Sequence, residues 1–307
     1  MRPAAVDARV RVGSVELPNA VIAASGTFGY GTEFAGLVPL GALGAISVKG
    51  LSLHPYEGKP APRLVETPAG MLNAIGLQNI GVAAFVQERL PALRDAGARV
   101  VANFWGDSPE EFAACAERLA DVPGIVALEL NAASPNRPEW GGVIAADPAG
   151  LAQVVRAVRR RVRCPLWVKL SPNTGDIVAA GRAAEAEGAD ALSAINTLRG
   201  MAVDLVTLRP ALASTTGGLS GPALKPVALA MVHALARAVR IPVVGIGGIR
   251  SGEDAVEFLA CGASAVQVGT ATFYDPAAPL RIAREIELWC RRHDIGAVAS
   301  VTGSLRA

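Results

Sequence analysis

Eight short apolar runs, distributed along the whole chain, constrain the fold more than any other feature of this sequence. Four of them follow a Gly-Ala step and are rich in β-branched or small residues; they fall in segments 40–50, 96–104, 187–196 and 261–269. Glycine suits the left-handed position that ends a helix, and such a short run is typical of a strand buried on both faces. Four more runs predict strands without this step: 20–25, 125–131, 165–170 and 241–248.

The segments between these runs carry helix signals. Segment 107–122 opens with an Asp or Ser N-cap, a proline and acidic residues in the first turn, and segments 147–162, 176–188 and 251–262 begin in a similar way. Strands that alternate with helices pair in parallel through βαβ units. Eight such units predict a single (β/α)8 barrel domain over residues 1–307. A doubly wound sheet is the alternative, but it typically carries an early GxGxxG sequence, and none follows the first run.

Three segments outside this repeat also carry signals. Residues 8–19 alternate apolar and polar side chains around Gly13-Ser14, which predicts a β-hairpin that closes the N-terminal end of the barrel. Residues 51–80 are rich in proline and glycine with few strand or helix signals, and residues 197–226 contain TTGGLSGP. Long loops in compact domains are usually binding loops or lids, so we expect both to border the site.

Composition excludes several classes of protein. With 51% hydrophobic and 18% charged residues, the chain can bury a large core and is not disordered. A net charge of +2 gives no nucleic-acid surface. The four cysteines are widely spaced, with no pattern for a zinc or iron–sulfur site, so we expect no metal. No apolar run is long enough to cross a membrane and no secretory signal is visible, which predicts a soluble cytoplasmic protein.

The predicted strand ends carry hydrogen-bond donors. Active sites of (β/α)8 barrels lie at the C-terminal ends of the strands. Those ends are, in chain order, Ser25, Lys49-Gly50, Asn103, Asn131, Lys169, Asn196-Thr197, Gly247-Gly248 and Gly269-Thr270. No Asp or Glu is among them, although Glu129 lies two residues before Asn131. This argues against a carboxylate metal site and against hydrolysis by paired carboxylates.

The donors indicate the kind of ligand. The chain has only four lysines, and two of them, Lys49 and Lys169, are at strand ends; inward lysines imply an anionic ligand. The glycines after the seventh and eighth strands allow close backbone approach to a phosphate. The site therefore suits a planar anionic ligand with a phosphate tail. Other interpretations stay open: Gly247-Gly248 as tight turns, Asn103 as a helix cap, and both lysines as surface residues if the register slips by one.

Two loops add candidate chemistry. LNAIGLQN (72–79) carries Asn73 and Asn79 near Gly76. NAASPNRPEWGG (131–142) follows the fourth strand directly and contains Ser134. A loop serine is usually structural, but its position over the predicted ligand makes Ser134 a candidate general acid/base.

The sequence resembles a known family, the class 1B dihydroorotate dehydrogenases. The resemblance covers nearly the whole chain, and the segments that carry it are ASGTFGYG (24–31), KGLSLHPYEGKPAPRLVETPAGMLNAIGLQNIG (49–81), WVKLSPN (167–173), SAINTLRGM (193–201), GGLSGPALKPVAL (217–229) and VVGIGGI (243–249). It implies an FMN-containing barrel that oxidises dihydroorotate to orotate in pyrimidine biosynthesis.

The resemblance also assigns residues to ligands. It implies FMN contacts at Ser25, Lys49, Gly50, Asn103, Asn131, Lys169, Ile195, Gly221, Gly247, Gly248, Gly269 and Thr270. It implies pyrimidine contacts at Lys49, Asn73, Ala74, Ile75, Gly76, Leu77, Asn131, Asn136, Asn196 and Thr197.

One loop departs from the family pattern. Class 1 enzymes have a cysteine base in a loop much like N-x-S-C-P-N, whereas this chain has serine at that position, Ser134, in NAASPN. Serine is the base in the membrane-associated class 2 enzymes, yet the N-terminal membrane extension of class 2 is not seen in this sequence. A hydroxyl is a far weaker acid than a thiol, so Ser134 needs a neighbouring proton acceptor.

The resemblance implies a mechanism and partners. Ser134 takes the proton from C5, a hydride passes from C6 to flavin N5, and Lys169 stabilises charge on the reduced ring. A second subunit with FAD and a [2Fe–2S] cluster passes electrons to NAD+, and the catalytic subunits form a homodimer core. Two alternatives remain: a related enzyme for another dihydropyrimidine, and a weakly active FMN-binding paralogue.

Overall fold

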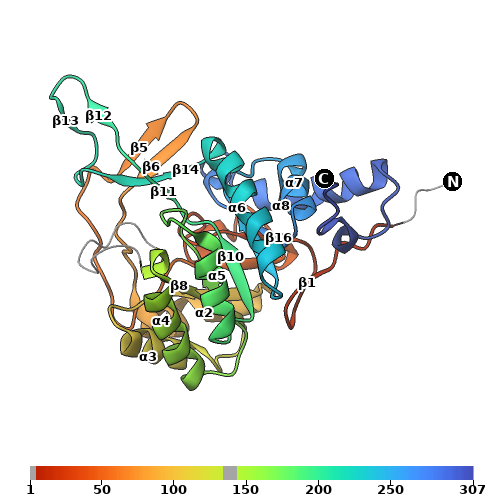
Figure 1. The fold of residues 1–307 in the computed structure, drawn as a ribbon, viewed down its shortest axis with the longest axis horizontal. Coiled ribbons are helices and arrows are strands. Elements are labelled where there is room, and N and C mark those ends of the chain that lie inside the picture. The colour runs from red at the N-terminus through yellow and green to blue at the C-terminus, as the bar shows by residue number, and fades with distance from the viewer. Residues whose placement is uncertain (1–4, 134–143, 307) are drawn as a thin grey trace.

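The computed structural model describes residues 5–133 and 144–306, and its centre is a closed barrel of eight parallel strands (Figure 1). Each predicted run contains one of these strands, so the predicted (β/α)8 fold is confirmed. Around the barrel they are β3 (Val21–Ala23), β4 (Ala45–Ser47), β7 (Val100–Phe104), β8 (Ile125–Asn131), β9 (Leu166–Lys169), β10 (Ala191–Ala194), β15 (Val243–Ile246) and β16 (Ala263–Val268). The strands β3, β4 and β10 end two residues before the predicted ends.

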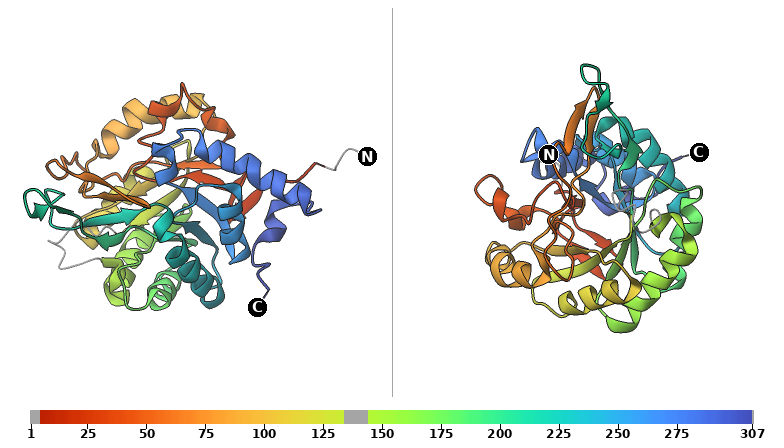
Figure 2. Two further views of the ribbon diagram at one scale, coloured as in Figure 1. Left: turned by 90° about the horizontal axis from the view of Figure 1, so that it is seen from above. Right: turned by 90° about the vertical axis from the view of Figure 1, so that its left-hand side faces the viewer.

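Helices surround the barrel (Figure 2). The four predicted helices are present as α3 (Pro109–Leu119), α4 (Pro148–Arg161), α5 (Ile177–Ala186) and α7 (Gly252–Ala260). The remaining helices are α1 (Gly81–Ala84), the π-helix η3 (Phe85–Arg89), α2 (Leu90–Asp95), α6 (Lys225–Ala238) and α8 (Ala278–Arg292). Short 3-10 turns are η1 (Thr32–Phe34), η2 (Leu40–Ala42), η5 (Ile144–Ala146), η6 (Pro222–Leu224), η7 (Thr270–Phe273) and η8 (Val298–Val301).

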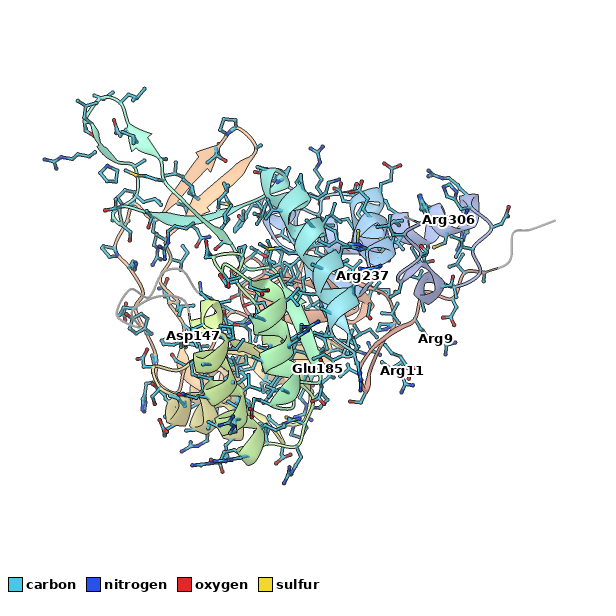
Figure 3. All side chains as sticks on the ribbon, viewed as in Figure 1. Arg9, Arg11, Asp147, Glu185, Arg237 and Arg306 are labelled. Atoms are coloured by element: carbon cyan, nitrogen blue, oxygen red, sulfur yellow. The ribbon has the colours of Figure 1, made fainter. Side chains whose placement is uncertain are left out.

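Side chains cap the predicted helices at their N-termini, as the sequence indicated. Asp147, labelled in Figure 3 at the start of α4, accepts hydrogen bonds from the backbone N–H groups of residues 149 and 150. Ser108 and Asp176 cap α3 and α5, and Ser251 forms a capping box with Asp254 at α7. Each cap satisfies backbone donors that have no partner within the helix. No helix in the described part of the chain is long and apolar enough to cross a membrane.

The predicted N-terminal hairpin is present. It consists of β1 (Val10–Val12) and β2 (Val15–Leu17), and its turn uses Gly13 with φ of 62°. The side chains of Val12 and Leu17 are fully buried, and Gly13 lies against the backbone of Asp190, just before β10. Because this is the N-terminal end of the barrel strand, the hairpin covers the end opposite to the predicted site.

The two long loops form a second sheet, which the sequence interpretation missed. Its order is β11 (Leu198–Gly200), β14 (Gly217–Ser220), β6 (Gly70–Asn73) and β5 (Leu64–Thr67), all antiparallel. A small hairpin of β12 (Val203–Asp204) and β13 (Arg209–Pro210) extends beyond it (Figure 1). These strands have two to four residues and contain several glycines, so they lack the alternation by which a strand is recognised in sequence.

Candidate active site

A cavity of about 800 Å³ lies between the C-terminal ends of the barrel strands and the second sheet. Leu64, Glu66 and Asn73 line it from the sheet, and Asn131 and Lys169 line it from the barrel. Nearly all described residues that the sequence analysis assigned to the site border this cavity: Ser25, Lys49, Gly50, Asn73, Ile75, Gly76, Leu77, Asn131, Lys169, Ile195, Asn196, Thr197, Gly221, Gly247, Gly248, Gly269 and Thr270. The structure therefore brings these residues together.

The two lysines provide positive charge from different sides. Lys169 is 5% exposed, and its Nζ lies 3.7 Å from Oε1 of Glu129. Lys49 is half-buried; burial lowers its pKa, the positive charge of Arg63 lowers it further, and Glu33 acts in the opposite direction. Both side chains line the cavity, so an anionic ligand there would meet two cations.

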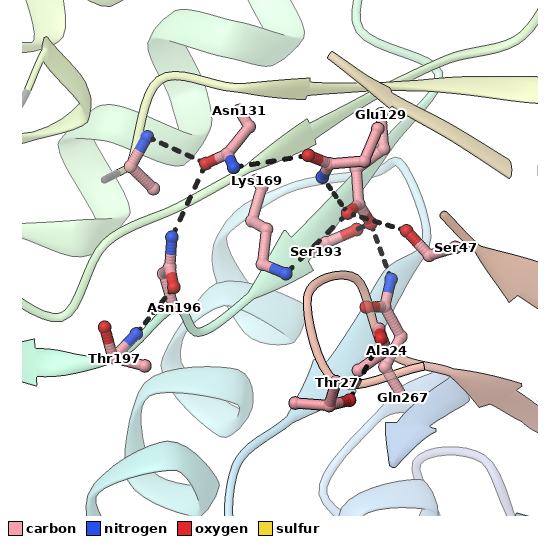
Figure 4. Close-up of polar contacts among 12 residues, drawn as sticks. Ala24, Thr27, Ser47, Glu129, Asn131, Lys169, Ser193, Asn196, Thr197 and Gln267 are labelled. Carbon is pink, nitrogen blue, oxygen red and sulfur yellow. Dashed lines mark hydrogen bonds and ion pairs between the residues drawn. The ribbon is translucent and has the colours of Figure 1, made fainter. Parts of the chain in front are cut away.

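Three asparagine side chains form a hydrogen-bonded series across the strand ends (Figure 4). Asn196 Nδ2 donates to Asn131 Oδ1 at 3.4 Å, and Asn131 Nδ2 donates to Asn103 Oδ1 at 3.3 Å. Asn103 in turn donates to Glu129 Oε1 at 2.6 Å. Asn103 and Asn131 thus have both amide groups fixed by neighbours, and Asn196 has its Nδ2 fixed.

Asn103 and Ala74 do not border the cavity. Asn103 is fully buried, and its contacts are with Glu129 and Asn131 rather than with the cavity surface. Ala74 is buried with Leu72 and Leu212 in a small core under the second sheet. These two residues are therefore not part of the cavity lining, and their assignments as ligand contacts stay predictions.

Glycine is required at the ends of β15 and at the facing loop. Gly247 and Gly248 have φ values of 138° and 73°, which L side chains rarely adopt. A Cβ on Gly248 would lie 2.9 Å from the carbonyl oxygen of Gly221. After β16, Gly269 leads into η7, whose first residue Thr270 donates from Oγ1 to Ser220 Oγ at 2.9 Å. The turns therefore have tight geometry and also border the cavity.

Asn79 has a structural role. Its Oδ1 accepts hydrogen bonds from the backbone N–H of Ser52 and of Gly81, and its Nδ2 donates to Ser52 Oγ. It is buried and fixes the 51–80 segment onto the start of α1. Asn73, by contrast, borders the cavity and donates from Nδ2 to the carbonyl oxygen of Gly218.

The candidate base lies outside the described residues. Ser134 and Asn136 belong to 134–143, and the described chain stops at Ala133, which is buried directly after β8. Their assignments therefore stay predictions. Among the described residues, no group of three or more His, Cys, Asp or Glu side chains could hold a metal ion.

Glu129 is a polar residue to which the sequence prediction assigned no role. It is fully buried at the centre of the barrel, and it accepts hydrogen bonds from Ser47, Asn103, Ser193 and Gln267 (Figure 4). The signal was available: Glu129 and Asn131 lie two residues apart in one strand, so their side chains point to the same face.

Fold and cavity together define a (β/α)8-barrel protein with a donor-rich, anion-binding site. A family model described as dihydroorotate dehydrogenase matches residues 8–289. The chain belongs to this family of oxidoreductases, which act in pyrimidine biosynthesis, so the resemblance is confirmed.

Named relatives cover almost the full chain. The chain is 54% identical to the dihydroorotate dehydrogenase B (NAD(+)) catalytic subunit of Trichlorobacter lovleyi, over 96% of this chain and 97% of that protein. It is 52% identical to the protein of the same name in Pelobacter propionicus, over 97% of this chain and 98% of that protein. It is 53% identical to the protein of the same name in Geobacter sulfurreducens, over 97% of this chain and 98% of that protein.

Proposed function

We propose that this chain is the FMN-dependent catalytic subunit of a dihydroorotate dehydrogenase and oxidises dihydroorotate to orotate. One observation carries the proposal: Lys49, Lys169 and the amides of Asn73, Asn131 and Asn196 border a single cavity at the strand ends of a barrel of this family. A small planar carboxylate with ring amides matches that set of donors and acceptors.

The residues present fit FMN. The cavity volume of about 800 Å³ is large enough for a cofactor and a small substrate together. Gly247 and Gly248 after β15 border the cavity without side chains, so a phosphate there could approach their backbone closely. Ser25, Gly248 and Thr270 would hold the phosphate and ribityl end, and Lys169 the ring. When bound, FMN supplies a hydride acceptor next to the substrate.

In this proposal, the substrate binds on the side of the cavity opposite to Lys169. Lys49 binds the carboxylate, and Asn73, Asn131 and Asn196 bind the ring amides. Glu66 and Leu64 of the second sheet border the same cavity, so this sheet limits water entry. Exclusion of water strengthens each of these electrostatic contacts.

Ser134 accepts the proton from C5 in this proposal. Ser134 follows Asn131 by three residues in the sequence, and Asn131 at the end of β8 borders the cavity. Because a serine hydroxyl is a weak acid, it needs an acceptor for its own proton. Lys169 stabilises the negative charge that develops when the substrate is oxidised.

The electrons then leave through a partner. The relatives are named as NAD(+)-type catalytic subunits, a name that implies a further subunit for electron transfer. We propose a partner with FAD and a [2Fe–2S] cluster that passes electrons to NAD+, as the class 1B resemblance implies.

Anaerobic mixing with dihydroorotate tests the function. We expect the flavin absorbance of the purified protein to bleach with dihydroorotate and to recover when an acceptor is added, with NAD+ effective only in the presence of the partner subunit. Bleaching by another dihydropyrimidine but not by dihydroorotate would refute the substrate assignment. No bleaching with any substrate, in a protein that holds FMN, would instead indicate a binding paralogue.

A further inference from the structure

Glu129 lies at the centre of a polar network that five barrel strands contribute to. Ser47 Oγ and Asn103 Nδ2 donate to Oε1 at 3.2 and 2.6 Å, from β4 and β7. Ser193 Oγ and Gln267 Nε2 donate to Oε2 at 2.9 and 2.5 Å, from β10 and β16. Lys169 approaches from β9. Glu129 is fully buried and does not border the cavity.

The chemistry of these neighbours identifies Glu129 as a charged acceptor. A carboxylate accepts hydrogen bonds at both oxygens and donates none, and four amide or hydroxyl groups donate to it. Gln267 commits its Nε2 to this carboxylate, although its Oε1 finds no partner among the described residues. A buried carboxylate with this many donors and a cation nearby offsets much of its desolvation cost.

Lys169 and Glu129 form an ion pair without a hydrogen bond. At 3.7 Å, Nζ is too far from Oε1 for a hydrogen bond, yet close enough for strong charge compensation. The structure gives this ammonium no hydrogen bond to another described side chain, and Lys169 lines the cavity (Figure 4). The N–H donors of Lys169 therefore remain available to a ligand, while Glu129, outside the cavity, offsets part of its charge.

The same carboxylate sets the direction of the asparagine series. Because Asn103 directs Nδ2 to Glu129, its Oδ1 faces Asn131. Asn131 then directs Nδ2 to Asn103, which leaves its Oδ1 to accept from Asn196. If Glu129 were replaced by a donor, the hydrogen bond that holds Asn103 in this orientation would be lost. The amides of Asn131 and Asn196 would then lose their fixed orientation as well.

We propose that Glu129 is a positioning residue: it fixes the orientation of the Asn103–Asn131–Asn196 series and offsets the charge of Lys169, and thereby sets the reduction potential of a flavin bound in the cavity. The proposal rests on the proposed function, because bound FMN provides the readout. A reduced flavin carries negative charge that a neighbouring cation stabilises. The negative charge of Glu129 weakens that stabilisation, which keeps the potential low enough for transfer to NAD+.

Three variants of the FMN-loaded protein separate charge from structure. Glu129→Gln keeps the shape but removes the charge and places an amide donor opposite Asn103. Glu129→Asp keeps the charge on a shorter side chain. Ser47→Ala removes one donor to Glu129 but leaves the contacts with Lys169 and Asn103 in place. For each variant we would measure the midpoint potential by dithionite titration with reference dyes, the FMN dissociation constant, and the melting temperature.

The expected result is a higher midpoint potential in Glu129→Gln, with Glu129→Asp and Ser47→Ala close to the native protein. FMN should bind at least about tenfold more weakly to Glu129→Gln, a change equivalent to about 1.4 kcal/mol. A native potential in Glu129→Gln, with only the melting temperature lowered, would show a purely structural role and overturn the proposal. The dithionite titration needs no dihydroorotate, so a native protein that holds FMN but ignores dihydroorotate would refute the substrate assignment alone.

Discussion

Replacement of Lys169 by methionine isolates the buried ion pair with Glu129. Methionine keeps most of the apolar stem and fills irregular space well, so the change removes the charge with little loss of packing. The side chain of Lys169 is 6% exposed and that of Glu129 is not exposed at all. Lys169→Met therefore leaves a carboxylate buried without its cation.

The magnitude follows from burial and distance. Two unit charges 3.7 Å apart interact by about 4 kcal/mol at an effective dielectric constant near 20. Loss of one partner of a buried pair typically costs about 3–5 kcal/mol. Because Glu129 keeps four hydrogen-bond donors after the change, we expect a value near the lower limit, about 3 kcal/mol. The exposed pair of Arg161 with Glu117 is the control, and Arg161→Gln should cost less than about 1 kcal/mol.

The assay is urea unfolding at several FMN concentrations, extrapolated to zero FMN. This extrapolation removes the stabilisation that a bound cofactor adds to the native state. The double variant with Glu129→Gln should lose less than the sum of the single losses, because the unpaired charge is gone. A loss from Lys169→Met no larger than that from Arg161→Gln would refute the reasoning, because it would show that the pair is effectively screened.

Three further predictions concern the cavity. Gly248→Ala should weaken FMN binding at least about tenfold, because its φ of 73° and the nearby Gly221 carbonyl oxygen both oppose a Cβ. Gly303→Ala is the control: it has the same φ but open space around it, so it should not weaken FMN binding. Fluorescence titration measures FMN binding to both variants. Ser134→Ala should slow flavin reduction by orders of magnitude with nearly native orotate binding, and Ser134→Cys should stay active with a lower pH optimum; stopped-flow reduction at native speed in the alanine variant would remove Ser134 from the mechanism. Burial lowers the pKa of Lys49, so its positive charge is lost at lower pH than for an exposed lysine. Orotate affinity should then fall as the pH rises, and calorimetry of Lys49→Met should show no such fall.

Much of the barrel could be predicted because its strands are buried on both faces. Segment 100–104 of β7 has no exposed residue, and such runs are largely apolar and easy to find in sequence. The second sheet could not be predicted in the same way. Its strands are short and contain glycines such as Gly217 and Gly218, and Gly218 pairs with Asn73 only because segments 145 residues apart meet over the barrel. Local sequence does not encode that meeting.

The cavity lining was largely predictable because parallel strands bring their C-terminal ends to one place. The two predicted residues that do not border the cavity, Asn103 and Ala74, show the limit of this reasoning. Asn103 is the last but one residue of β7, and residues 50 and 51 lie against it: the backbone N–H of Leu51 donates to its carbonyl oxygen, and a Cβ on Gly50 would lie 2.8 Å from its Oδ1. A residue's position at a strand end is set by local pattern, but its access to the cavity is set by how neighbouring loops cross it.

Glu129 shows why a list of strand ends is not yet an active site. Its position one layer below the strand ends made it seem an exception to a donor-rich site, whereas the structure makes it the acceptor that the donors require. Lys169 and Asn103 would both be costly to bury without it. A barrel that presents an inward lysine to an anionic ligand needs a compensating charge, and that charge must be out of the ligand's reach. The layer below the strand ends meets both conditions, because its side chains point inward and the residues above them cover it.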